Sequence, residues 1–328
     1  MSTASDTCAT LFVMDPLDRI HVDGDSTYMM MLEAQRRGFP VWMCVPGDLY
    51  TRGGLAHAKA TRVTVSTEAP HFVSEPAEDV GLDRFDVVWM RKDPPFDMDY
   101  VFSTYILDAV PPTTLVLNDP RSIRNASEKM FTLQFPQFIT ETLITREVER
   151  VLRFAAQAPG RVVLKPWDGN GGRGVLVSRH GDANLRSMAE ILTAEGRAYV
   201  IAQHYIPEIK DGDKRIILID GEPVGWMLRV PGEDDHRGNM HVGASVVACA
   251  LTDRDKEVCD ALGPVLRKMG LLFVGIDMIG DHLTEINVTS PTGIQEINRL
   301  MGTQLERTLT DAVVERLARH RAQQPENR

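Results

Sequence analysis

The clearest alternation of apolar and polar positions lies between residues 271 and 298, LLFVGIDMIGDHLTEINVTSPTGIQEIN. The pattern predicts an apolar strand over 271–279, a turn at 280–282, a strand over 283–288 and a helix that begins after Thr292. Successive side chains of a strand point to opposite faces, so the polar positions of this hairpin gather on one face. We therefore expect the chemistry of the chain on that face.

Two carboxylates face each other across the predicted hairpin. If it closes through three turn residues, Ile279 lies opposite Leu283 and Asp277 lies opposite Glu285, about 5 Å away. Carboxylates at that separation repel each other unless a positive group lies between them. Asn287 shares the face of Glu285, and three such oxygen ligands suit Mg²⁺ that is bound together with a nucleotide. The alternative is that these polar side chains only face solvent.

Short apolar runs alternate with a helical period in the first third of the chain. Strands are predicted over residues 8–14, 40–45, 85–90 and 114–117, and a helix over 26–37. Strand, helix and strand with short links predict a parallel α/β sheet. Arg91 and Lys92 follow the third strand, at the sheet edge where open sheets bind ligands, and could hold an acidic small molecule or face solvent. No G-x-G-x-x-G follows the first strand, which weakens a dinucleotide interpretation.

The segment Asn118 to Pro120 marks the first domain boundary. A helix over 122–135 that carries Lys129, an extended segment over 136–144 and a helix over 147–156 are predicted next. A lone lysine on a helix is usually solvated. Only the residues that follow make Lys129 a candidate for a functional role.

A glycine-rich loop lies inside VVLKPWDGNGGRGVLV, residues 162–177. Glycines let main-chain N–H groups approach phosphate oxygens. The loop joins two strands, whereas a P-loop or a Rossmann turn leads into a helix, so it is predicted to be a hairpin flap. Lys165 lies among apolar residues of the first strand and needs an anion to offset its desolvation.

A strand over 199–206 precedes a second hairpin, 215–230, which turns at Asp220-Gly221. Arg215 begins its first strand and Arg229 ends its second, and two guanidinium groups so close indicate an anionic target. The polar segment 231–245 is long for a connection and predicts a lid or disorder. A helix over 253–269, interrupted at Gly263-Pro264, and a helix over 303–319 complete the pattern.

Composition narrows the class of protein. The 328 residues are 43% hydrophobic and 25% charged, as in an ordinary globular protein, and the net charge of -10 argues against a nucleic acid or an anionic membrane as partner. The four cysteines show no C-x-x-C pairing, which predicts reduced thiols in a cytoplasmic protein. The nine histidines lack zinc-site spacing. No apolar run approaches the roughly 20 residues of a membrane span.

A magnesium-bound nucleotide, two lysines, a glycine flap and an arginine pair together indicate phosphoryl transfer by positioning and charge neutralisation. No Ser-His-Asp or Cys-His arrangement stands out. We therefore expect a substrate oxygen to attack the γ-phosphate directly.

Several motifs resemble those of the prokaryotic glutathione synthetases, which are ATP-grasp ligases. They are MDP (14–16), MMLEAQRRG (30–38), GDLY (47–50), MRKDPPFD (90–97), TYIL (104–107), LKPWDGNGG (164–172), IKDGDKR (209–215), FVGIDMIGD (273–281) and LTEINVTSPT (283–292). The likeness extends from about residue 10 to residue 317. MRKDPPFD and TEINVTSPT are specific to this family, whereas the flap and the acidic hairpin alone would indicate only the superfamily.

The resemblance implies an α/β fold with an N-terminal parallel-sheet domain, pre-ATP-grasp and Rossmann-like, followed by a two-lobed ATP-grasp α+β domain. The implied ranges are 1–121 for the N-terminal domain, 122–206 for the small lobe, 207–320 for the large lobe with the metal site, and 321–328 for a disordered tail. It also implies a homo-oligomer, a homotetramer or a homodimer.

The activity that the resemblance implies is the ATP-dependent joining of γ-glutamylcysteine to glycine. The C-terminal carboxylate of the dipeptide attacks the γ-phosphate, and the amine of glycine then displaces phosphate from the acyl phosphate. The implied cofactors are ATP and Mg²⁺, with Mn²⁺ as the alternative metal.

Matching motifs also imply residue roles. Asp277, Glu285 and Asn287 would bind the metal. Lys129, Lys165, Gly169, Gly171, Gly172, Gln203, His204, Tyr205, Ile206 and Asp213 would hold ATP. Arg215 and Arg229 would neutralise the acyl phosphate, and Arg237 would be a catalytic arginine of the lid. Asp25, Ser26 and Arg91 would orient the dipeptide, and Ser290, Pro291 and Thr292 would place the substrates beside the metal.

One departure from the family pattern affects the lid. Where the family often has Gly-Gly-Arg, this chain has Gly243-Ala244-Ser245, although Arg237 is kept. Loss of a charge-assisted contact to an anion costs about 1.5–3 kcal/mol, about tenfold to a hundredfold in rate, unless His241 compensates. Two alternatives follow: a carboxylate-amine ligase with another acceptor amino acid, and a nucleotide-binding sensor without catalysis.

Overall fold

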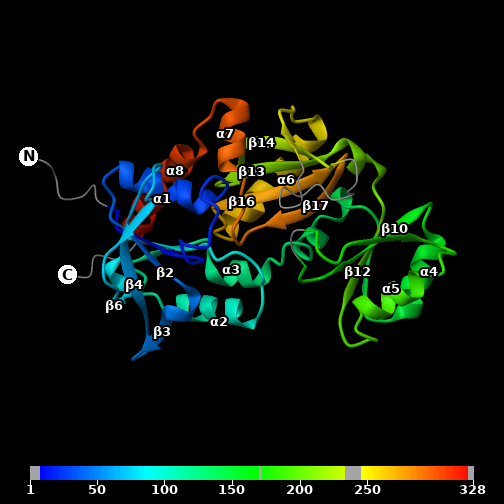
Figure 1. The fold of residues 1–328 in the computed structure, drawn as a ribbon, viewed down its shortest axis with the longest axis horizontal. Helices are drawn as coiled ribbons and strands as arrows, with labels where there is room; N and C mark the ends of the chain where they lie inside the picture. Colours follow the sequence, from blue (N-terminus) through cyan, green and yellow to red (C-terminus); the bar gives the residue numbers. More distant parts are fainter. Residues whose placement is uncertain (1–7, 170–171, 233–244, 324–328) are drawn as a thin grey trace, which may run out of the picture.

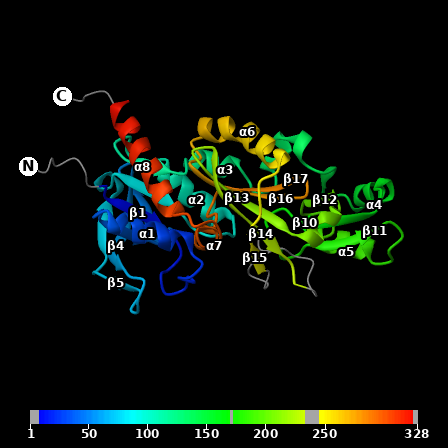
Figure 2. The same ribbon diagram turned by 90° about the horizontal axis from the view of Figure 1, so that it is seen from above.

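The computed structural model describes residues 8–169, 172–232 and 245–323. Figure 1 shows an elongated molecule in three parts: the N-terminal sheet in blue and cyan at one end, a small green lobe at the other, and the C-terminal sheet between them. Figure 2 shows the same succession from above. The mixed α/β architecture predicted from the sequence is confirmed.

The N-terminal part is built around an eight-stranded sheet. Its elements are β1 (Thr10–Val13), α1 (Ser26–Arg36), β2 (Val41–Cys44), η1 (Pro46–Asp48), β3 (Leu49–Arg52), β4 (Leu55–Val65), β5 (Phe72–Ser74), β6 (Glu78–Gly81), η2 (Leu82–Arg84), β7 (Val87–Met90), α2 (Met98–Leu107) and β8 (Leu115–Leu117). The order is β3-β4-β2-β1-β7-β8, with β5 and β6 paired to β4. Strands β2, β1, β7 and β8 are parallel, as predicted, and β1 and β7 are fully buried. Strands β3 to β6 were not predicted.

The small lobe is a four-stranded antiparallel sheet with two helices. It contains β9 (Thr142–Thr145), α4 (Val148–Gln157), β10 (Arg161–Pro166), β11 (Leu176–Arg179), α5 (Leu185–Leu192) and β12 (Val200–His204), in the strand order β11-β10-β12-β9. Both helices lie on one face of the sheet (Figure 1). They enclose a separate small core that includes Val151, Phe154, Leu164 and Ala189.

The large lobe is a five-stranded antiparallel sheet in the order β15-β14-β13-β16-β17. It contains η5 (Pro207–Asp211), β13 (Asp213–Ile219), β14 (Glu222–Val230), β15 (Ser245–Val247), α6 (Asp253–Lys268), β16 (Phe273–Ile279), β17 (His282–Asn287), α7 (Ile294–Met301) and α8 (Leu305–Ala322). The predicted hairpin turn at Asp220-Gly221 is confirmed. Most of the predicted lid, residues 233–244, lies outside the described residues, and so do residues 324–328 of the predicted disordered tail, 321–328. The first two residues of that tail, Arg321 and Ala322, are helical instead, because α8 continues through them.

Two helix predictions were wrong. Residues 122–135 do not form one helix: α3 (Pro120–Asn125) ends early, Lys129 lies in a turn, and two short 3-10 helices follow, η3 (Phe131–Gln134) and η4 (Pro136–Phe138). The chain leaves the helical path because the carbonyl of Glu128 accepts a hydrogen bond from Ile286 N at 2.9 Å. Helix α6 is not interrupted, because it continues through Pro264.

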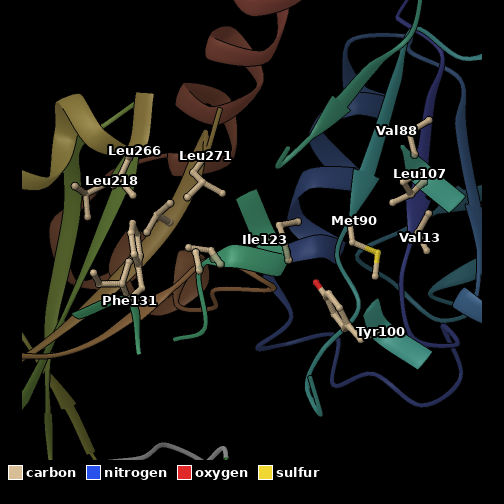
Figure 3. Packing of buried hydrophobic residues seen from close by; sticks show 14 of the residues in the cluster. Val13, Val88, Met90, Tyr100, Leu107, Ile123, Phe131, Leu218, Leu266 and Leu271 are labelled. Atoms are coloured by element: carbon tan, nitrogen blue, oxygen red, sulfur yellow. The ribbon is translucent and has the colours of Figure 1, made fainter. Parts of the chain in front are cut away.

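One hydrophobic core joins the N-terminal sheet to the large lobe. Figure 3 shows it running from Val13, Val88 and Met90 of the sheet, past Ile123, to Leu218 and the neighbouring residues of the large lobe. These side chains are almost fully buried. The N-terminal sheet and the large lobe therefore share their apolar packing, whereas the small lobe has its own core.

Candidate active site

The register of the β16–β17 hairpin places Asp277 opposite Glu285, as predicted. Two details differ from the expected pairing. Ile279 lies opposite His282 and Met278 opposite Leu283, so the turn has two residues rather than three. An irregularity between Asp277 and Met278 absorbs the extra residue. The shorter turn and the bulge cancel, which is why the two carboxylates still face each other.

Asp277 is 3% exposed and is bound by two arginines. Arg215 donates Nε to Oδ1 at 2.5 Å and Nη2 to Oδ2 at 2.9 Å, and Arg229 Nη2 lies 3.0 Å from Oδ1. Asn287 Nδ2 donates to Oδ2 at 3.2 Å. Burial alone would raise the pKa of Asp277, but the two guanidinium groups outweigh it and hold that pKa well below its usual range. The anionic group that the arginine pair meets is therefore this carboxylate.

A second buried acid lies beside Arg229. Asp213 Oδ2 accepts from Arg229 Nη2 at 2.5 Å, and burial raises the pKa of Asp213 to about 7 against the effect of that arginine. Asp213 Oδ1 and Arg229 Nε are buried without a hydrogen-bond partner among the described residues. A buried polar atom without a partner costs free energy, so both atoms favour a ligand or water at this point.

The other carboxylate of the hairpin, Glu285, faces a lysine from the turn before η3. Lys129 Nζ lies 3.4 Å from Glu285 Oε1 and also donates to the carbonyl of Gly169 in the glycine-rich loop. Burial lowers the pKa of Lys129, but Glu285 and then Glu128 outweigh it and raise that pKa. Lys129 reaches the hairpin from a turn. The helix expected over 122–135 does not account for this position.

Lys165 lies in β10 and forms no ion pair with any residue in the described ranges. Burial lowers its pKa, with Glu285 acting in the opposite direction. A half-buried ammonium group that forms no ion pair in the described part of the chain is an expected feature of a phosphate site.

Sequence reasoning missed Glu128. Burial, and then the charge of Glu285, raises its pKa to about 6. Its Oε1 accepts a hydrogen bond from Thr289 Oγ1 at 2.9 Å. The available signal was its place next to Lys129, but only the fold shows that it meets the segment that follows β17.

The donor set of the hairpin suits a hard divalent cation. Asp277 and Glu285 offer carboxylate oxygens, and Asn287 uses its N–H on Asp277, which leaves its amide oxygen for a cation. No cluster of three His, Cys, Asp or Glu side chains in the described part of the chain is arranged to hold a metal ion. The amide is therefore needed to complete a three-ligand set.

The predicted dipeptide residues meet the segment that follows β17. Arg91 is 3% exposed, donates Nε to Thr27 Oγ1 at 3.0 Å and donates Nη2 to the carbonyl of Pro291 at 3.0 Å. Burial lowers its pKa, and no carboxylate is hydrogen-bonded to it within the described ranges. Arg215 Nη1 reaches the carbonyl of Thr292 at 3.2 Å. The N-terminal cation and the Asp277 cluster thus contact one short segment, residues 290–292.

Two further predicted residues lie at the start of α1. Asp25 caps the helix by accepting a hydrogen bond from Tyr28 N at 2.8 Å, and burial raises its pKa. Ser26 is fully buried, and its Oγ accepts from Ile294 N at 3.3 Å. Sequence reasoning missed Gln295, whose Nε2 donates to the carbonyl of Asp25 at 2.8 Å. These contacts fasten the start of α1 to α7.

The end of β12 is not part of the Asp277 cluster. Gln203 donates to Thr142 Oγ1 at 2.9 Å, the His204 ring lies 5.0 Å from that of Phe154, and Arg161 lies over Tyr205. These side chains pack within the small lobe, and Ile206 follows them as the residue before η5. Of the remaining predicted residues, Gly172 has a φ of 73°, and Gly171 and Arg237 lie outside the described residues.

Comparison with known proteins supports the same family from two directions. The model "Prokaryotic glutathione synthetase, N-terminal domain" matches residues 9–124, and "Prokaryotic glutathione synthetase, ATP-grasp domain" matches residues 128–302. The glutathione synthetase of Pseudomonas syringae pv. tomato is 46% identical over 308 residues, 93% of this chain and 96% of that relative. The glutathione synthetase of Agrobacterium fabrum is 44% identical over 301 residues, 92% of this chain and 94% of that relative.

Among solved structures, the D-cycloserine synthetase DcsG is 17% identical with a TM-score of 0.65, covering 94% of this chain and 100% of that one. The ATP-grasp ligase PsnB in complex with a minimal precursor is 18% identical with a TM-score of 0.61, covering 94% and 99%. At this identity the likeness concerns the fold, which is that of the ATP-grasp ligases. Together with the two domain models, these comparisons show that the chain belongs to the prokaryotic glutathione synthetase family of ATP-dependent ligases.

Proposed function

We propose that the chain makes glutathione from γ-glutamylcysteine and glycine at the Asp277–Glu285 hairpin, with ATP and Mg²⁺, and with Mn²⁺ as the alternative metal. The observation that carries the assignment of the site is the meeting of three cations from three segments, Lys129, Arg215 and Arg229, on these two carboxylates, with Lys165 within electrostatic reach of Glu285. Such a concentration of cations suits a triphosphate and a developing acyl phosphate.

In this proposal the two lysines bind the phosphates of ATP, together with the main-chain N–H groups of Gly169 and Gly172. Asp277, Glu285 and Asn287 hold the divalent cation, which supplies neutralisation of phosphate charge. Both arginines contact Asp277. With the metal held by this carboxylate, Arg215 and Arg229 would offer their N–H groups to the anionic phosphate that is transferred.

Arg91 is proposed to hold a carboxylate of the dipeptide, with Asp25, Ser26 and residues 290–292 completing the site. A guanidinium group that is 3% exposed and bonded only to neutral oxygens gains most from a carboxylate partner. The dipeptide's C-terminal carboxylate would then lie between Arg91 and the transferred phosphate, ready to attack it.

The acyl phosphate must be shielded from water, because it hydrolyses. The predicted lid, 231–245, with Arg237 is our candidate for this role. The assignment of Gln203 to Ile206 to an adenine slot, with Asp213 nearby, also stays a prediction.

Three broader features are proposed as well: the domain ranges 1–121, 122–206 and 207–320, a homotetramer or homodimer, and a cytoplasmic location. In the described part of the chain, no helix combines the length and the apolar character that a membrane span needs.

The proposal is tested by ADP release from the purified protein with MgATP and γ-glutamylcysteine, with and without glycine, and with alanine or serine in place of glycine. Release that requires both substrates, with an equal amount of tripeptide, is the expected result. Faster release with another amino acid would keep the acyl-phosphate mechanism and change the acceptor. Absence of dipeptide-dependent release despite ATP binding would overturn the ligase activity and favour the sensor.

A further inference from the structure

The side-chain amide of Asn118 uses all of its hydrogen-bonding capacity on one strand pair of the large lobe. Asn118 follows β8 of the N-terminal sheet and is 3% exposed. Its Nδ2 donates to the carbonyls of Phe273 and Val288, both at 2.9 Å. Its Oδ1 accepts from the N–H groups of Leu272 at 2.8 Å and Phe273 at 3.1 Å. Two donors and two lone pairs are the full capacity of a carboxamide.

These hydrogen bonds connect the backbones of both strands of the hairpin that carries the candidate metal ligands. Phe273 is the first residue of β16, which continues to Asp277. Val288 directly follows β17, which carries Glu285 and Asn287. Asn118 thus holds the open end of the hairpin, opposite its turn.

On the other side, Asn118 is tied to Arg91 through the sheet. Leu117 pairs with Trp89 of β7, and Arg91 follows β7 directly, with its N–H on the carbonyl of Val13. Only one strand pairing and a few residues of buried strand therefore separate the amide from the cation proposed to bind the dipeptide.

Two further contacts link Arg91 directly to the hairpin and to the segment that follows it. The guanidinium group of Arg91 lies over the ring of Phe273, 5.1 Å from its centroid, and Phe273 is the residue that Asn118 holds by both N–H and carbonyl. Arg91 also donates to the carbonyl of Pro291, three residues after Val288. Arg91 thus contacts the hairpin at two places. One is Phe273, which Asn118 bonds directly, and the other is Pro291, which lies shortly after Val288, another residue that Asn118 bonds.

We propose that Asn118 is a positioning residue that sets the separation between Arg91 and the Asp277 hairpin, so that the dipeptide carboxylate meets the γ-phosphate at reacting distance. The inference rests on the proposed function for its substrates. It assigns to Asn118 no contact with either substrate. A misplacement of about 1 Å between reacting groups can cost about a hundredfold in rate even when each substrate still binds.

Neither aspartate nor serine can make this set of contacts. Aspartate has a similar shape but would bring a carboxylate against two carbonyl oxygens and lose both donors. Serine is too short to reach both strands and leaves several buried backbone groups without partners. Asn118→Asp and Asn118→Ser therefore release the hairpin in different ways, and the serine variant avoids a buried charge.

Gln35 provides a matched control. Its amide also bonds two backbone groups of a strand, donating to the carbonyl of Val65 and accepting from Val65 N, both at 2.8 Å. It fastens α1 to β4 within the N-terminal sheet, away from the route between Arg91 and Asp277. Gln35→Leu thus removes amide-to-backbone bonds without releasing the hairpin.

The first test compares kcat with ligand affinities. For Asn118→Ser and Asn118→Asp we expect kcat per folded molecule to fall by about tenfold to a hundredfold, with the Kd of a non-hydrolysable MgATP analogue within twofold of the parent value. For Gln35→Leu we expect an unchanged kcat. Unchanged kcat in both Asn118 variants, with only a lower Tm, would show that Asn118 is merely structural and would overturn the proposal.

The second test needs no substrate, so its failure is separate from failure of the proposed function. Spin labels are attached at two exposed positions, through Lys59→Cys on β4 and Asp281→Cys in the β16–β17 turn, with Cys249 replaced by serine. Pulsed EPR then gives the distance distribution between the labels. Asn118→Ser should shift or broaden it, and Gln35→Leu should not. An unchanged distribution in Asn118→Ser would overturn the proposal even if kcat fell.

Discussion

At the scale of single residues, the charged side chains of the site are paired with one another. Arg215 and Arg229 neutralise Asp277, and Lys129 neutralises Glu285. Buried ion pairs of this kind seldom add stability, because desolvation offsets most of the Coulomb attraction. We therefore attribute their presence to the proposed function, in which each cation would bind phosphate oxygens of the nucleotide.

Arg215→Lys tests this exchange. The guanidinium group bonds both oxygens of Asp277 and the carbonyl of Thr292, and a lysine cannot reproduce that fork. We expect kcat to fall by about 10²–10³-fold with little change in the KM for ATP, because the lost contact forms to charge that develops during transfer. Steady-state kinetics with both substrates saturating provides the measurement. Arg267→Lys, at a half-exposed ion pair on α6, is the control, and an Arg215→Lys enzyme with at least a third of the parent kcat would contradict the assignment.

The residues that sequence reasoning found and missed differ in a consistent physical way. Asp277 and Glu285 could be placed on one face of the hairpin by strand alternation, and their pairing was right because the two-residue turn and the bulge offset each other. Glu128, Thr27 and Gln295 could not be found, because each reaches the site through a long-range contact that no local pattern encodes.

At the scale of elements, Gly263 explains why α6 carries a glycine yet continues unbroken. A Cβ built at Gly263 would lie 2.5 Å from the carbonyl oxygen of Gly221, in the turn between β13 and β14. The glycine lets the helix backbone approach the hairpin turn. A close contact between two elements therefore explains the glycine at position 263, whereas the sequence suggested a break in the helix.

Gly263→Ala should consequently destabilise the protein, although alanine is the better helix former. Helix propensity favours alanine by about 1 kcal/mol, but a contact at 2.5 Å to backbone must be relieved by moving the turn away. Overpacking of this kind costs about 1–3 kcal/mol, so we expect a net loss in the free energy of unfolding. Urea denaturation measures it. Gly47→Ala, where a Cβ meets nothing within 4 Å, is the control, and a stabilised Gly263→Ala would show that the turn yields freely.

The end of α1 makes a prediction for pH. Glu33 is 3% exposed and accepts hydrogen bonds from Arg36 and Arg37, and the bond from Arg36 is the main cause of a lowered pKa. A lowered carboxyl pKa means that the folded state binds fewer protons than the unfolded state. The stabilisation is complete above the ordinary glutamate pKa of about 4.3 and is lost as the pH falls below it.

Glu33→Gln should therefore lower the Tm at pH 7. The difference in Tm between the parent protein and the variant should become smaller as the pH falls from about 5 toward 3. Thermal unfolding across that range is the measurement. Glu147→Gln serves as a control, because its partner Arg150 and Glu147 itself are both more than half exposed. A Tm difference that stays constant with pH would show that packing, not charge, explains the effect of Glu33→Gln.

Most strands of the core could be predicted from apolar runs, but β4 could not. Its inward positions include Ala56, Ala58 and Ala60, and all three are buried. Small alanines give a weak alternation in hydropathy, even though burial along β4 alternates clearly. The helix expected over 122–135 failed for the opposite reason, because the tertiary bond from Ile286 to Glu128 overrides a good local pattern.

At the scale of the whole molecule, the apolar packing divides the chain unevenly. The N-terminal sheet and the large lobe share one core, and the small lobe has its own. Lys129 Nζ, which lies beside the large lobe, reaches across to the carbonyl of Gly169 in the small lobe. Within the described residues, apolar packing does not connect the small lobe to the rest of the molecule. We infer that a nucleotide held by Lys129, Lys165 and the hairpin would connect the two parts through charged contacts.

This division predicts how ligands change global stability. A non-hydrolysable ATP analogue at 100 times its Kd stabilises the folded state by about 2.7 kcal/mol. For a chain of 328 residues, that corresponds to a rise in Tm of about 4 °C. We expect this rise when Mg²⁺ is present, and we expect EDTA to remove most of it. In the proposed site Asp277 and Glu285 would face the triphosphate and would need a cation between these negative charges. Glu285→Gln should lose the Mg²⁺-dependent part, whereas Glu222→Gln, at an exposed acid, should keep it. Equal stabilisation with and without Mg²⁺ would show that the lysines and arginines alone hold the nucleotide and that the hairpin carboxylates have another role.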